Sequence, residues 1–417
     1  MSKTEQKDLF GVLMKNDDNH EFEMVPMKLG APGPATLKGC SDLLKTATVQ
    51  TLNEESEEQY IFQYGPRSGC PEFREELAKF LSVEYGNVVE SNNLMVTAGA
   101  TQGLHLISTV LFDVNTPVFV EDPTYFIAIT MLQQDLGMNI ISVPTDKDGI
   151  LVDELGKLLE EHYPIDKNIN QKSPFWAMVY LIPVFSNPKG YTLPPERCRK
   201  LVQLARKYDV LLLAEDVYNL ITFSEEPPPP RLLQYDEKSD PEYKGNTLSN
   251  CTFSKILAPS LRLGWIEATD RVHQLLSMCH TAHSGGSFNH YMSKLMTVAL
   301  KMGLVTNHLK RLRKVYKERM DLVYVELKSK LPSSVKVREP QGGFFLWLEL
   351  PLSIDTEKLN ELCTDKYRVN FLTGISASPT KSYRNCLRLS ISYCTGEQLI
   401  SGIERLANAI KEMLTSS

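Results

Sequence analysis

The sequence lacks the features that mark several classes of protein. Its 417 residues include eight cysteines, and no two of them form a C-x-x-C pair, which argues against a zinc ribbon or a dithiol redox motif. Eight cysteines are also too few for a disulfide framework in a chain of this length, so we expect free thiols in a reducing compartment. No run of about 18 apolar residues occurs, and the polar start MSKTEQKDLF leads into no apolar signal segment. We therefore expect a cytoplasmic protein without a membrane partner.

Charge and motif content exclude further classes. The chain holds 45 Lys and Arg residues against 51 Asp and Glu residues, a net charge of −6, so it lacks the basic excess typical of nucleic-acid-binding proteins. There is no internal repeat, no P-loop and no G-x-G-x-x-G run, which argues against the nucleotide-binding folds built on those motifs. Apolar residues make up 42% and charged residues 23%, as in ordinary globular proteins. We expect a globular protein with no metal site and no nucleic-acid partner.

The pattern of apolar residues indicates two kinds of architecture along the chain. Between about residue 65 and about residue 290, apolar runs such as PVFVEDP and VLLLAEDVY alternate with helical patterns, which predicts an α/β domain with a mostly parallel sheet. Residues 288–331 read as helix, a length that predicts a break near Gly303 or a helix bridging two domains. Later runs such as GGFFLWLELP and CLRLSISY indicate antiparallel strands in a second, α+β domain.

The segment Cys251–Trp265 carries the strongest chemical signal. It reads CTFSKILAPSLRLGW, so Lys255 sits beside hydroxyl groups and precedes Arg262 by seven residues. A lysine amine among such groups is a candidate Schiff-base nucleophile, because nearby cationic charge and desolvation favour its unprotonated form. The arginine and the hydroxyls could bind a phosphate. The alternative is a solvated Lys and Arg pair on a loop.

A second candidate is an aspartate at the end of an apolar run. Asp216 follows LLLAE, at the strand end where α/β proteins bind ligands, and Tyr218 lies two residues further on the same side. A buried carboxylate there requires a cationic or N–H partner, and a protonated pyridine nitrogen would serve. The alternative is an aspartate that caps a helix after the strand.

Two weaker signals lie earlier in the chain. Asn187 begins the turn NPKG, which by itself predicts only a turn. In TAGATQGL, residues 97–104, a strand reaches a glycine and a helix then begins at small residues. Free N–H groups at such a helix start would form a seat for a phosphate group.

Taken together, these motifs resemble those of the fold-type I pyridoxal-phosphate enzymes, specifically the class I/II aminotransferases. TFSKILAPSLRLG is similar to the lysine motif of that family, and Asn-Pro-x-Gly, Asp-x-Tyr and a late arginine occur in the family's order. Asn187 and Asp216 are 29 residues apart, and Asp216 and Lys255 are 39 apart. One departure is the stretch NFLTGISASPTKSYRNCLRLS, which lacks the Pro-Gly-x-x-Phe segment usual before the late arginine. The segment 371–385 is therefore atypical, and in the family this region often lines the pocket.

The resemblance implies a fold and an assembly. We expect an α/β protein whose large domain has a mostly parallel seven-stranded sheet flanked by helices, with a smaller α+β domain formed by the N- and C-terminal parts. The implied division is an N-terminal segment over residues 1–60, a large coenzyme-binding domain over 61–300 and a small domain over 301–417. Tyr64, in QYGPRSG, matches a tyrosine that reaches the coenzyme phosphate of the neighbouring subunit, which implies a homodimer with shared active sites.

The resemblance also assigns a role to each matching residue. Lys255 would form the Schiff base with pyridoxal 5'-phosphate and carry the proton of the substrate Cα, and Asp216 would keep the pyridine nitrogen protonated. Asn187 and Tyr218 would bond the phenolic oxygen of the ring, and Tyr125 would stack on its face. The phosphate would be held by Ala100, Thr101, Thr252, Ser254 and Arg262. Arg388 would bind the substrate α-carboxylate, with Asn187 and Gly30 beside it.

The implied activity is transfer of an amino group from an L-amino acid to a 2-oxo acid by a ping-pong mechanism. A lyase or decarboxylase on the same scaffold remains an alternative, because both need the same lysine and aspartate. A transcription regulator with an aminotransferase-like domain is disfavoured, since only about 30 residues precede Gly30 and the chain is acidic.

The sequence is most similar in character to 2-aminoadipate, aromatic and kynurenine aminotransferases. A dicarboxylic substrate would require a second cation, for which Lys38 and Arg67 are candidates; the alternative is that both are solvated. Glutamate and 2-oxoglutarate are the default donor and acceptor.

Overall fold

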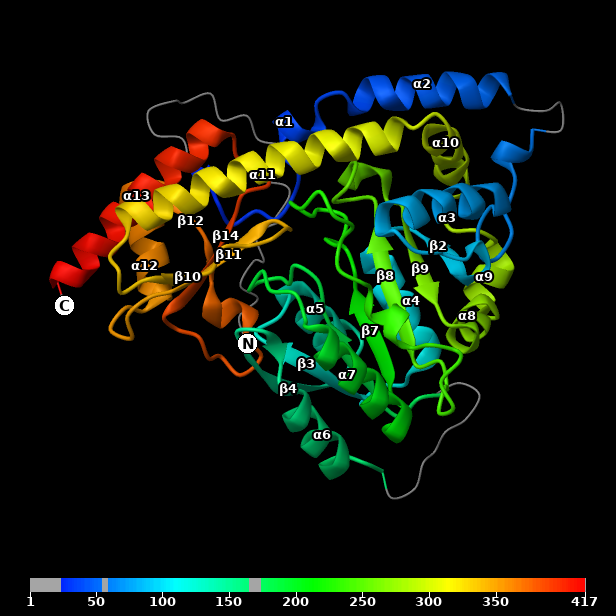
Figure 1. The fold of residues 1–417 in the computed structure, drawn as a ribbon, viewed down its shortest axis with the longest axis horizontal. Helices are drawn as coiled ribbons and strands as arrows, with labels where there is room; N and C mark the ends of the chain where they lie inside the picture. Colours follow the sequence, from blue (N-terminus) through cyan, green and yellow to red (C-terminus); the bar gives the residue numbers. More distant parts are fainter. Residues whose placement is uncertain (1–23, 55–58, 165–173, 417) are drawn as a thin grey trace.

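The fold was analysed in a computed structural model that describes residues 24–54, 59–164 and 174–416. Its largest element is a sheet with the strand order β2-β9-β8-β7-β6-β3-β4-β5 (Figure 1). The strands are β2 (Leu94–Thr97), β3 (Pro117–Asp122), β4 (Asn139–Asp146), β5 (Gly149–Ile150), β6 (Met178–Leu181), β7 (Leu211–Glu215), β8 (Thr247–Thr252) and β9 (Gly264–Ala268). Strands β4, β3, β6, β7 and β8 pair in parallel, whereas β9 is antiparallel to both of its neighbours. The predicted mostly parallel sheet is confirmed.

The sheet has one strand more than the seven that we predicted. The additional strand is β5, whose two residues pair antiparallel with the end of β4. A strand of two residues is too short to show the alternation by which strands are recognised in a sequence.

Helices cover both faces of this sheet. They are α3 (Pro71–Tyr85), α4 (Ala100–Leu111), α5 (Phe126–Thr130), α6 (Val152–Glu161), α7 (Pro195–Tyr208), α8 (Asp270–Ser277), α9 (His280–Gly285) and α10 (His290–Lys301). Successive side chains of a strand point to opposite faces, and in β7 Leu211 and Leu213 join the core that includes α3 and α4. Leu212 and Ala214 join the second core, with α6 and α7. Burial on both faces explains why the strands read as continuous apolar runs.

The C-terminal part forms a second, smaller sheet with the order β10-β11-β14-β13. Its strands are β10 (Lys336–Val337), β11 (Phe345–Glu349), β13 (Leu372–Thr373) and β14 (Cys386–Ser390), all paired antiparallel. The helices of this part are α12 (Thr356–Leu362) and α13 (Gly396–Ser416). The N-terminal strand β1 (Val25–Pro26) pairs in parallel with β12 (Val369–Asn370), so residues from both ends of the chain lie together. The domain limits 1–60, 61–300 and 301–417 stay a prediction.

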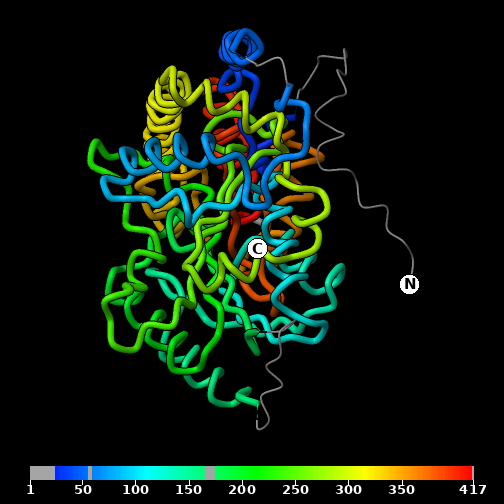
Figure 2. Tube along the Cα trace, turned by 90° about the vertical axis from the view of Figure 1, so that its right-hand side faces the viewer, coloured from blue at the N-terminus to red at the C-terminus, as the bar shows by residue number. Residues whose placement is uncertain are grey.

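A long helix connects the two parts. The helical zone breaks at Met302 and Gly303, and α11 (Leu304–Lys330) then runs from the large sheet to the small one (Figure 1). Gly303 has a φ of 68°, a left-handed conformation that favours glycine, which explains why the helix ends there. The predicted break is therefore confirmed. The helices α1 (Pro34–Leu37) and α2 (Cys40–Asn53) lie along the same edge of the molecule as α11, and α2 and α11 are both seen end-on at the top of Figure 2.

The paired state of the cysteines and the apolar character of the helices can be read from the structure. All eight cysteines lie in the described part of the chain, and none forms a disulfide. Among the described residues, no helix is long and apolar enough to cross a membrane.

Candidate active site

Lys255 lies in the turn that follows β8, close to the C-terminal edge of the parallel strands. Its Nζ donates a hydrogen bond of 2.9 Å to the carbonyl of Gly30, on the N-terminal segment. Burial, together with the nearby positive charge of Arg388, lowers the pKa of Lys255 to about 8. The amine is therefore far more readily deprotonated than a solvent-exposed lysine, as a nucleophile or a base requires.

Asp216 follows β7, on the strand beside β8. It is 4% exposed, and its Oδ2 accepts a hydrogen bond of 2.5 Å from the Ser249 hydroxyl. Burial raises the pKa of Asp216, and the bond from Ser249 opposes that shift. Its other oxygen, Oδ1, is buried without a hydrogen-bond partner in the described structure. The Asn219 side chain is close enough to lower the pKa of Asp216, but its amide completes no hydrogen bond to Oδ1. A buried acceptor without a partner is costly, so this oxygen can accept a hydrogen bond from a bound group.

Arg388, on β14, is a buried cation whose partners are neutral. Its Nη1 donates to Oδ1 of Asn187 at 2.7 Å, and its Nη2 donates to the Lys28 carbonyl at 2.6 Å. Its Nε is buried without a partner, and burial lowers the pKa of Arg388 to about 10. The guanidinium carbon lies 4.1 Å from the centre of the Phe345 ring. A buried guanidinium with an unused N–H and neutral partners is suited to binding a carboxylate.

The start of α4 and the loop after β8 form a seat for an anion. Arg262 Nη2 donates to the Ala98 carbonyl at 3.4 Å, just before Ala100 and Thr101 begin the helix. Arg262 Nη1 lies 3.5 Å from the Ser254 hydroxyl, which accepts a hydrogen bond of 2.9 Å from Thr252. Gly99 has a φ of 88°, and a Cβ there would lie 2.8 Å from Arg262 Nη2. The glycine therefore allows the arginine to approach the helix start, where N–H groups favour negative charge.

Comparison with known proteins shows the family to which the chain belongs. The family described as Aminotransferase class I and II matches residues 27–406. The chain belongs to this family. An uncharacterized aminotransferase of Saccharolobus solfataricus is 30% identical over 93% of this chain and 91% of its own length. Membership makes the protein a pyridoxal-phosphate-dependent aminotransferase.

Two relatives carry more specific names. Aromatic-amino-acid aminotransferase 1 of Thermococcus litoralis is 29% identical, with 94% of this chain and 88% of that protein covered. The crystal structure of Pyrococcus horikoshii kynurenine aminotransferase superposes with a TM-score of 0.82 at 27% identity, covering 99% of this chain and 96% of the other. These likenesses support the class I/II aminotransferase branch that the sequence resembles.

The described residues of this aminotransferase fit pyridoxal phosphate. The oxygen of Asp216 without a partner suits a protonated pyridine nitrogen, and the seat at the start of α4 suits a phosphate. The amine of Lys255 has a pKa that suits bond formation with an aldehyde.

The aromatic residues that we predicted for the site differ in their exposure. Tyr218 is 4% exposed, and its ring centre lies 5.4 Å from the centres of both the Phe344 and Phe345 rings. Tyr125 is half-buried directly before α5, and burial raises its pKa to about 12. Tyr64 is 79% exposed, so in the single chain its side chain contributes nothing to the site.

Gly30 has a packing role that the sequence did not indicate. A Cβ at this position would lie 2.7 Å from Cζ of Phe345, the ring beneath Arg388. The absence of a side chain at residue 30 therefore allows the N-terminal segment to cross the small sheet beside the guanidinium.

Several side chains near the site were not predicted from the sequence. Ser249 bonds Asp216, Phe345 stacks under Arg388, and the half-buried Lys28 has its pKa lowered by burial and by the charge of Arg388. A polar pair, Ser249 and Asn250, inside a fully buried strand is the signal that could have identified the first of them. The predicted second cations, Lys38 and Arg67, are both exposed.

The atypical segment before Arg388 packs against the end of β3. The carbonyl of Ala377 accepts a hydrogen bond of 2.9 Å from the Thr124 amide, next to Tyr125. Thr380 donates to Oδ2 of Asp122 at 2.5 Å, and the Tyr383 hydroxyl donates to the Asp122 carbonyl at 2.8 Å. This segment therefore joins the small sheet to the large one beside the predicted stacking tyrosine.

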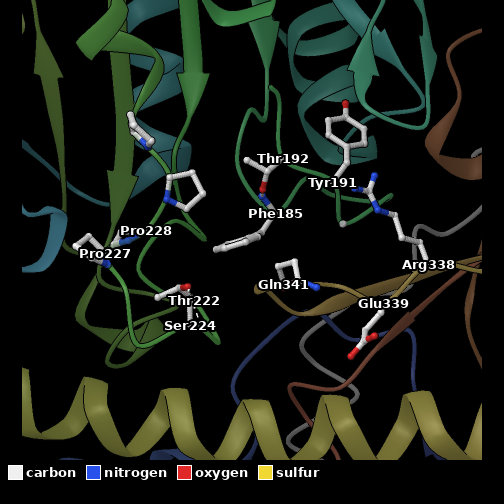
Figure 3. A pocket seen from close by; sticks show the side chains of 13 residues that line it. Phe185, Tyr191, Thr192, Thr222, Ser224, Pro227, Pro228, Arg338, Glu339 and Gln341 are labelled. Atoms are coloured by element: carbon white, nitrogen blue, oxygen red, sulfur yellow. Dashed lines mark hydrogen bonds between the residues drawn. The ribbon is translucent and has the colours of Figure 1, made fainter. Parts of the chain in front are cut away.

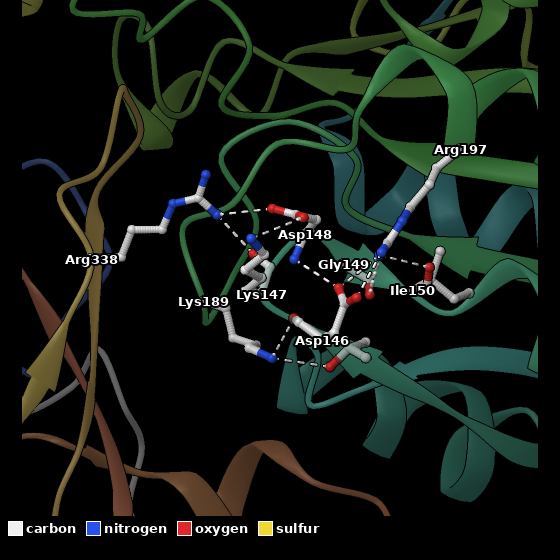
Figure 4. Close-up of polar contacts among 9 residues, drawn as sticks. Asp146, Lys147, Asp148, Gly149, Ile150, Lys189, Arg197 and Arg338 are labelled. Carbon is white, nitrogen blue, oxygen red and sulfur yellow. Dashed lines mark hydrogen bonds and ion pairs between the residues drawn. The ribbon is translucent and has the colours of Figure 1, made fainter.

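Two further features lie on the side of the Asn187 turn. A cavity of about 380 Å³ is bounded by Phe185, the prolines 227–230, Arg338, Glu339 and Gln341, and its lining includes no residue predicted for the site (Figure 3). Beside it, Lys189 donates to the Asp146 carbonyl at 2.9 Å and Arg197 donates to Oδ1 of Asp146 at 2.7 Å (Figure 4). The Lys189 contact holds the Asn187 turn against the end of β4, and the Arg197 contact joins α7 to the same strand end.

Proposed function

We propose that the protein transfers an amino group from an L-amino acid to a 2-oxo acid by a ping-pong mechanism, with Lys255 as the residue that holds the coenzyme covalently. The observation that carries the proposal is the combination of three unusual groups, two that follow β7 and β8 of the large sheet and one on β14 of the small sheet. These are an amine with a pKa of about 8, a buried carboxylate oxygen without a partner, and a buried guanidinium with neutral partners.

Each predicted residue has a proposed role. Asp216 would accept a hydrogen bond from the pyridine nitrogen, and Asn187 and Tyr218 would lie at the phenolic side of the ring. Tyr125 would cover one ring face. The phosphate would be held by Ala100, Thr101, Thr252, Ser254 and Arg262. When bound, pyridoxal phosphate supplies a ring that withdraws electrons from the substrate Cα.

The protein itself would position the substrate and move a proton. Arg388 would bind the α-carboxylate in its guanidinium fork, beside Gly30 and Asn187, and so fix the direction of the Cα–H bond. Lys255 Nζ would take the proton from Cα as a base, which its lowered pKa favours near neutral pH.

The complete site is proposed to need a second copy of the chain. Tyr64 is 79% exposed on the single chain, although its sequence context matches a residue that contacts the phosphate of a neighbouring subunit. A homodimer would bury this side chain against the anion seat, where its hydroxyl could donate to the phosphate.

The amino-acid substrate is proposed from the relatives and from the charges at the site. Relatives named aromatic-amino-acid and kynurenine aminotransferases favour a bulky side chain, and glutamate with 2-oxoglutarate is the default donor and acceptor pair. Lys28 offers a cation close to Arg388 that could bind a second carboxylate.

The proposal is tested by the visible absorption of the purified, coenzyme-loaded protein with single L-amino acids and no oxo acid. We expect the coenzyme band to convert with one amino acid and to return on addition of 2-oxoglutarate. A band that never converts while ammonia or carbon dioxide is released would overturn transamination in favour of a lyase or decarboxylase.

A further inference from the structure

A second buried carboxyl group lies beside Asp216 and has no role in the proposed mechanism. Glu215 is the last residue of β7 and is 8% exposed. In the sheet register it lies opposite Asn250 of the neighbouring strand β8. The Asn250 amide nitrogen donates to Oε2 of Glu215 at 3.0 Å and to the Ala100 carbonyl at 2.8 Å. One amide group therefore connects the strand that leads to Asp216 with the first turn of α4.

This bridge is enclosed by close packing. Asn250 is fully buried, and a Cβ added to Gly103 of α4 would lie 2.2 Å from its Oδ1. Since no real side chain tolerates that distance, the glycine allows α4 to approach β8 at this point. The position of the anion seat relative to Asp216 thus depends on Glu215 and Asn250.

Glu215 also lies among the groups that would titrate in the active site. Burial is the main cause that raises its pKa to about 8; the charge of Asp216 acts in the same direction, and the bond from Asn250 and the positive charge of Lys255 oppose the shift. The carboxyl group therefore gains its negative charge as the pH rises through about 8, close to the pH at which Lys255 titrates. The titratable groups on which its charge acts are Lys255 after β8, Cys251 on β8, Tyr125 before α5, Tyr180 on β6 and Tyr218 after β7. The first turn of α4, residues 100–103, adds no titratable side chain.

We propose that Glu215 is a positioning residue of this aminotransferase, which fixes the start of α4 through Asn250 and whose carboxylate, once ionised, favours the protonated form of the nitrogen at Lys255. The inference rests on the proposed attachment of the coenzyme to Lys255. Because that nitrogen must be unprotonated to act as a base, Glu215 would set the pH range in which the enzyme works.

The experiment is a spectroscopic pH titration of the coenzyme-loaded wild type and Glu215→Gln. The glutamine keeps an oxygen that can accept from Asn250, so the bridge remains while the charge is lost. We expect the apparent pKa read from the visible band to fall by about half a unit to one unit in the variant, because a neighbouring negative charge no longer favours the protonated nitrogen. Glu215→Asp retains a carboxylate, so its apparent pKa should lie close to that of the wild type.

Glu121 provides a matched control. It is also a buried glutamate at the end of a central strand, 1% exposed, with a raised pKa of about 7 because of burial. It accepts hydrogen bonds from the Tyr191 hydroxyl and the Ile182 amide, and its charge is not among those that act on Lys255. The titration of Glu121→Gln should therefore match that of the wild type.

A second variant tests the bridge without removing the carboxyl group. Asn250→Ala should weaken coenzyme affinity by about tenfold, because one hydrogen bond to the helix start is lost. The affinity is measured by adding the coenzyme to the coenzyme-free protein and following tryptophan fluorescence. Thermal unfolding shows whether each variant folds. If Glu215→Gln does not fold, Glu215→Ala replaces it in the titration, and Asn250→Ala tests the bridge.

The outcomes separate the two proposals. A wild-type protein that forms no visible band with the coenzyme contradicts the proposed function itself. A normal wild-type band with an unshifted titration of Glu215→Gln, or an equal shift in Glu121→Gln, overturns only the role of Glu215. Unchanged coenzyme affinity in Asn250→Ala overturns the positioning part.

Discussion

Replacing Arg388 by lysine tests how the substrate carboxylate is bound. The guanidinium is 3% exposed, donates to Asn187 at 2.7 Å and to the Lys28 carbonyl at 2.6 Å, and lies over Phe345. A lysine keeps the positive charge but has no planar fork, so it would lose one of two parallel bonds to the carboxylate and leave Asn187 without its donor. A hydrogen bond to a charged group contributes about 1.5–3 kcal/mol, and the unpaired Asn187 adds to the cost. We therefore expect transition-state stabilisation to fall by about 2–4 kcal/mol, which corresponds to a decrease of about 30- to 1,000-fold in kcat/KM.

The assay for Arg388→Lys is the single-turnover reaction of the coenzyme-loaded enzyme with its amino acid. The visible band of the resting enzyme should persist, because Arg388 does not hold the coenzyme in the proposed site. Arg319→Lys is a matched control: Arg319 is 6% exposed and bonds the Ile391 and Ser392 carbonyls, so its replacement should lower stability more than substrate affinity. A loss below about threefold for Arg388→Lys, or an equal loss in the control, would refute the reasoning.

Three further predictions follow from the same geometry. Since the pKa of Lys255 is lowered to about 8, its amine is mostly unprotonated above that pH. The rate of acylation of Lys255 in the coenzyme-free protein should therefore rise as the pH passes through 8. A rate that rises only near 10.5, the ordinary pKa of a lysine, would contradict this. Asp216→Asn should reduce turnover by about 10- to 100-fold, because a neutral amide stabilises the protonated ring nitrogen less well, and steady-state kinetics that match the wild type would exclude that role. Lys28→Met should raise the KM for glutamate several-fold but not that for leucine, and an equal change for both would show that Lys28 does not bind a second carboxylate.

Much of the fold was predictable because it follows from local patterns. The strands buried on both faces read as apolar runs, and Gly303 indicated where the long helix breaks. The short strand β5 was not predictable, since its two residues have no periodicity and form a strand only because they follow β4 through a tight connection.

Candidate site residues could be assigned where a motif fixes both the residue and its spacing. Lys255, Asp216 and Arg388 were assigned in this way, each on or beside a different element, and their roles stay predictions. Ser249, Asn250 and Phe345 could not be assigned, because their contacts arise from pairing between strands that are distant in the sequence. The register of a sheet is set by the whole fold and is not written in any one segment.

The attachment point of the coenzyme can be measured directly. The protein would be loaded with pyridoxal phosphate, reduced with borohydride, digested and mapped by mass spectrometry, with Lys189, another partly buried lysine of lowered pKa, as an internal comparison. We predict that the reduced coenzyme is found on the peptide that contains Lys255 and that Lys189 is unmodified. Modification of another lysine with Lys255 intact would contradict the proposed active site.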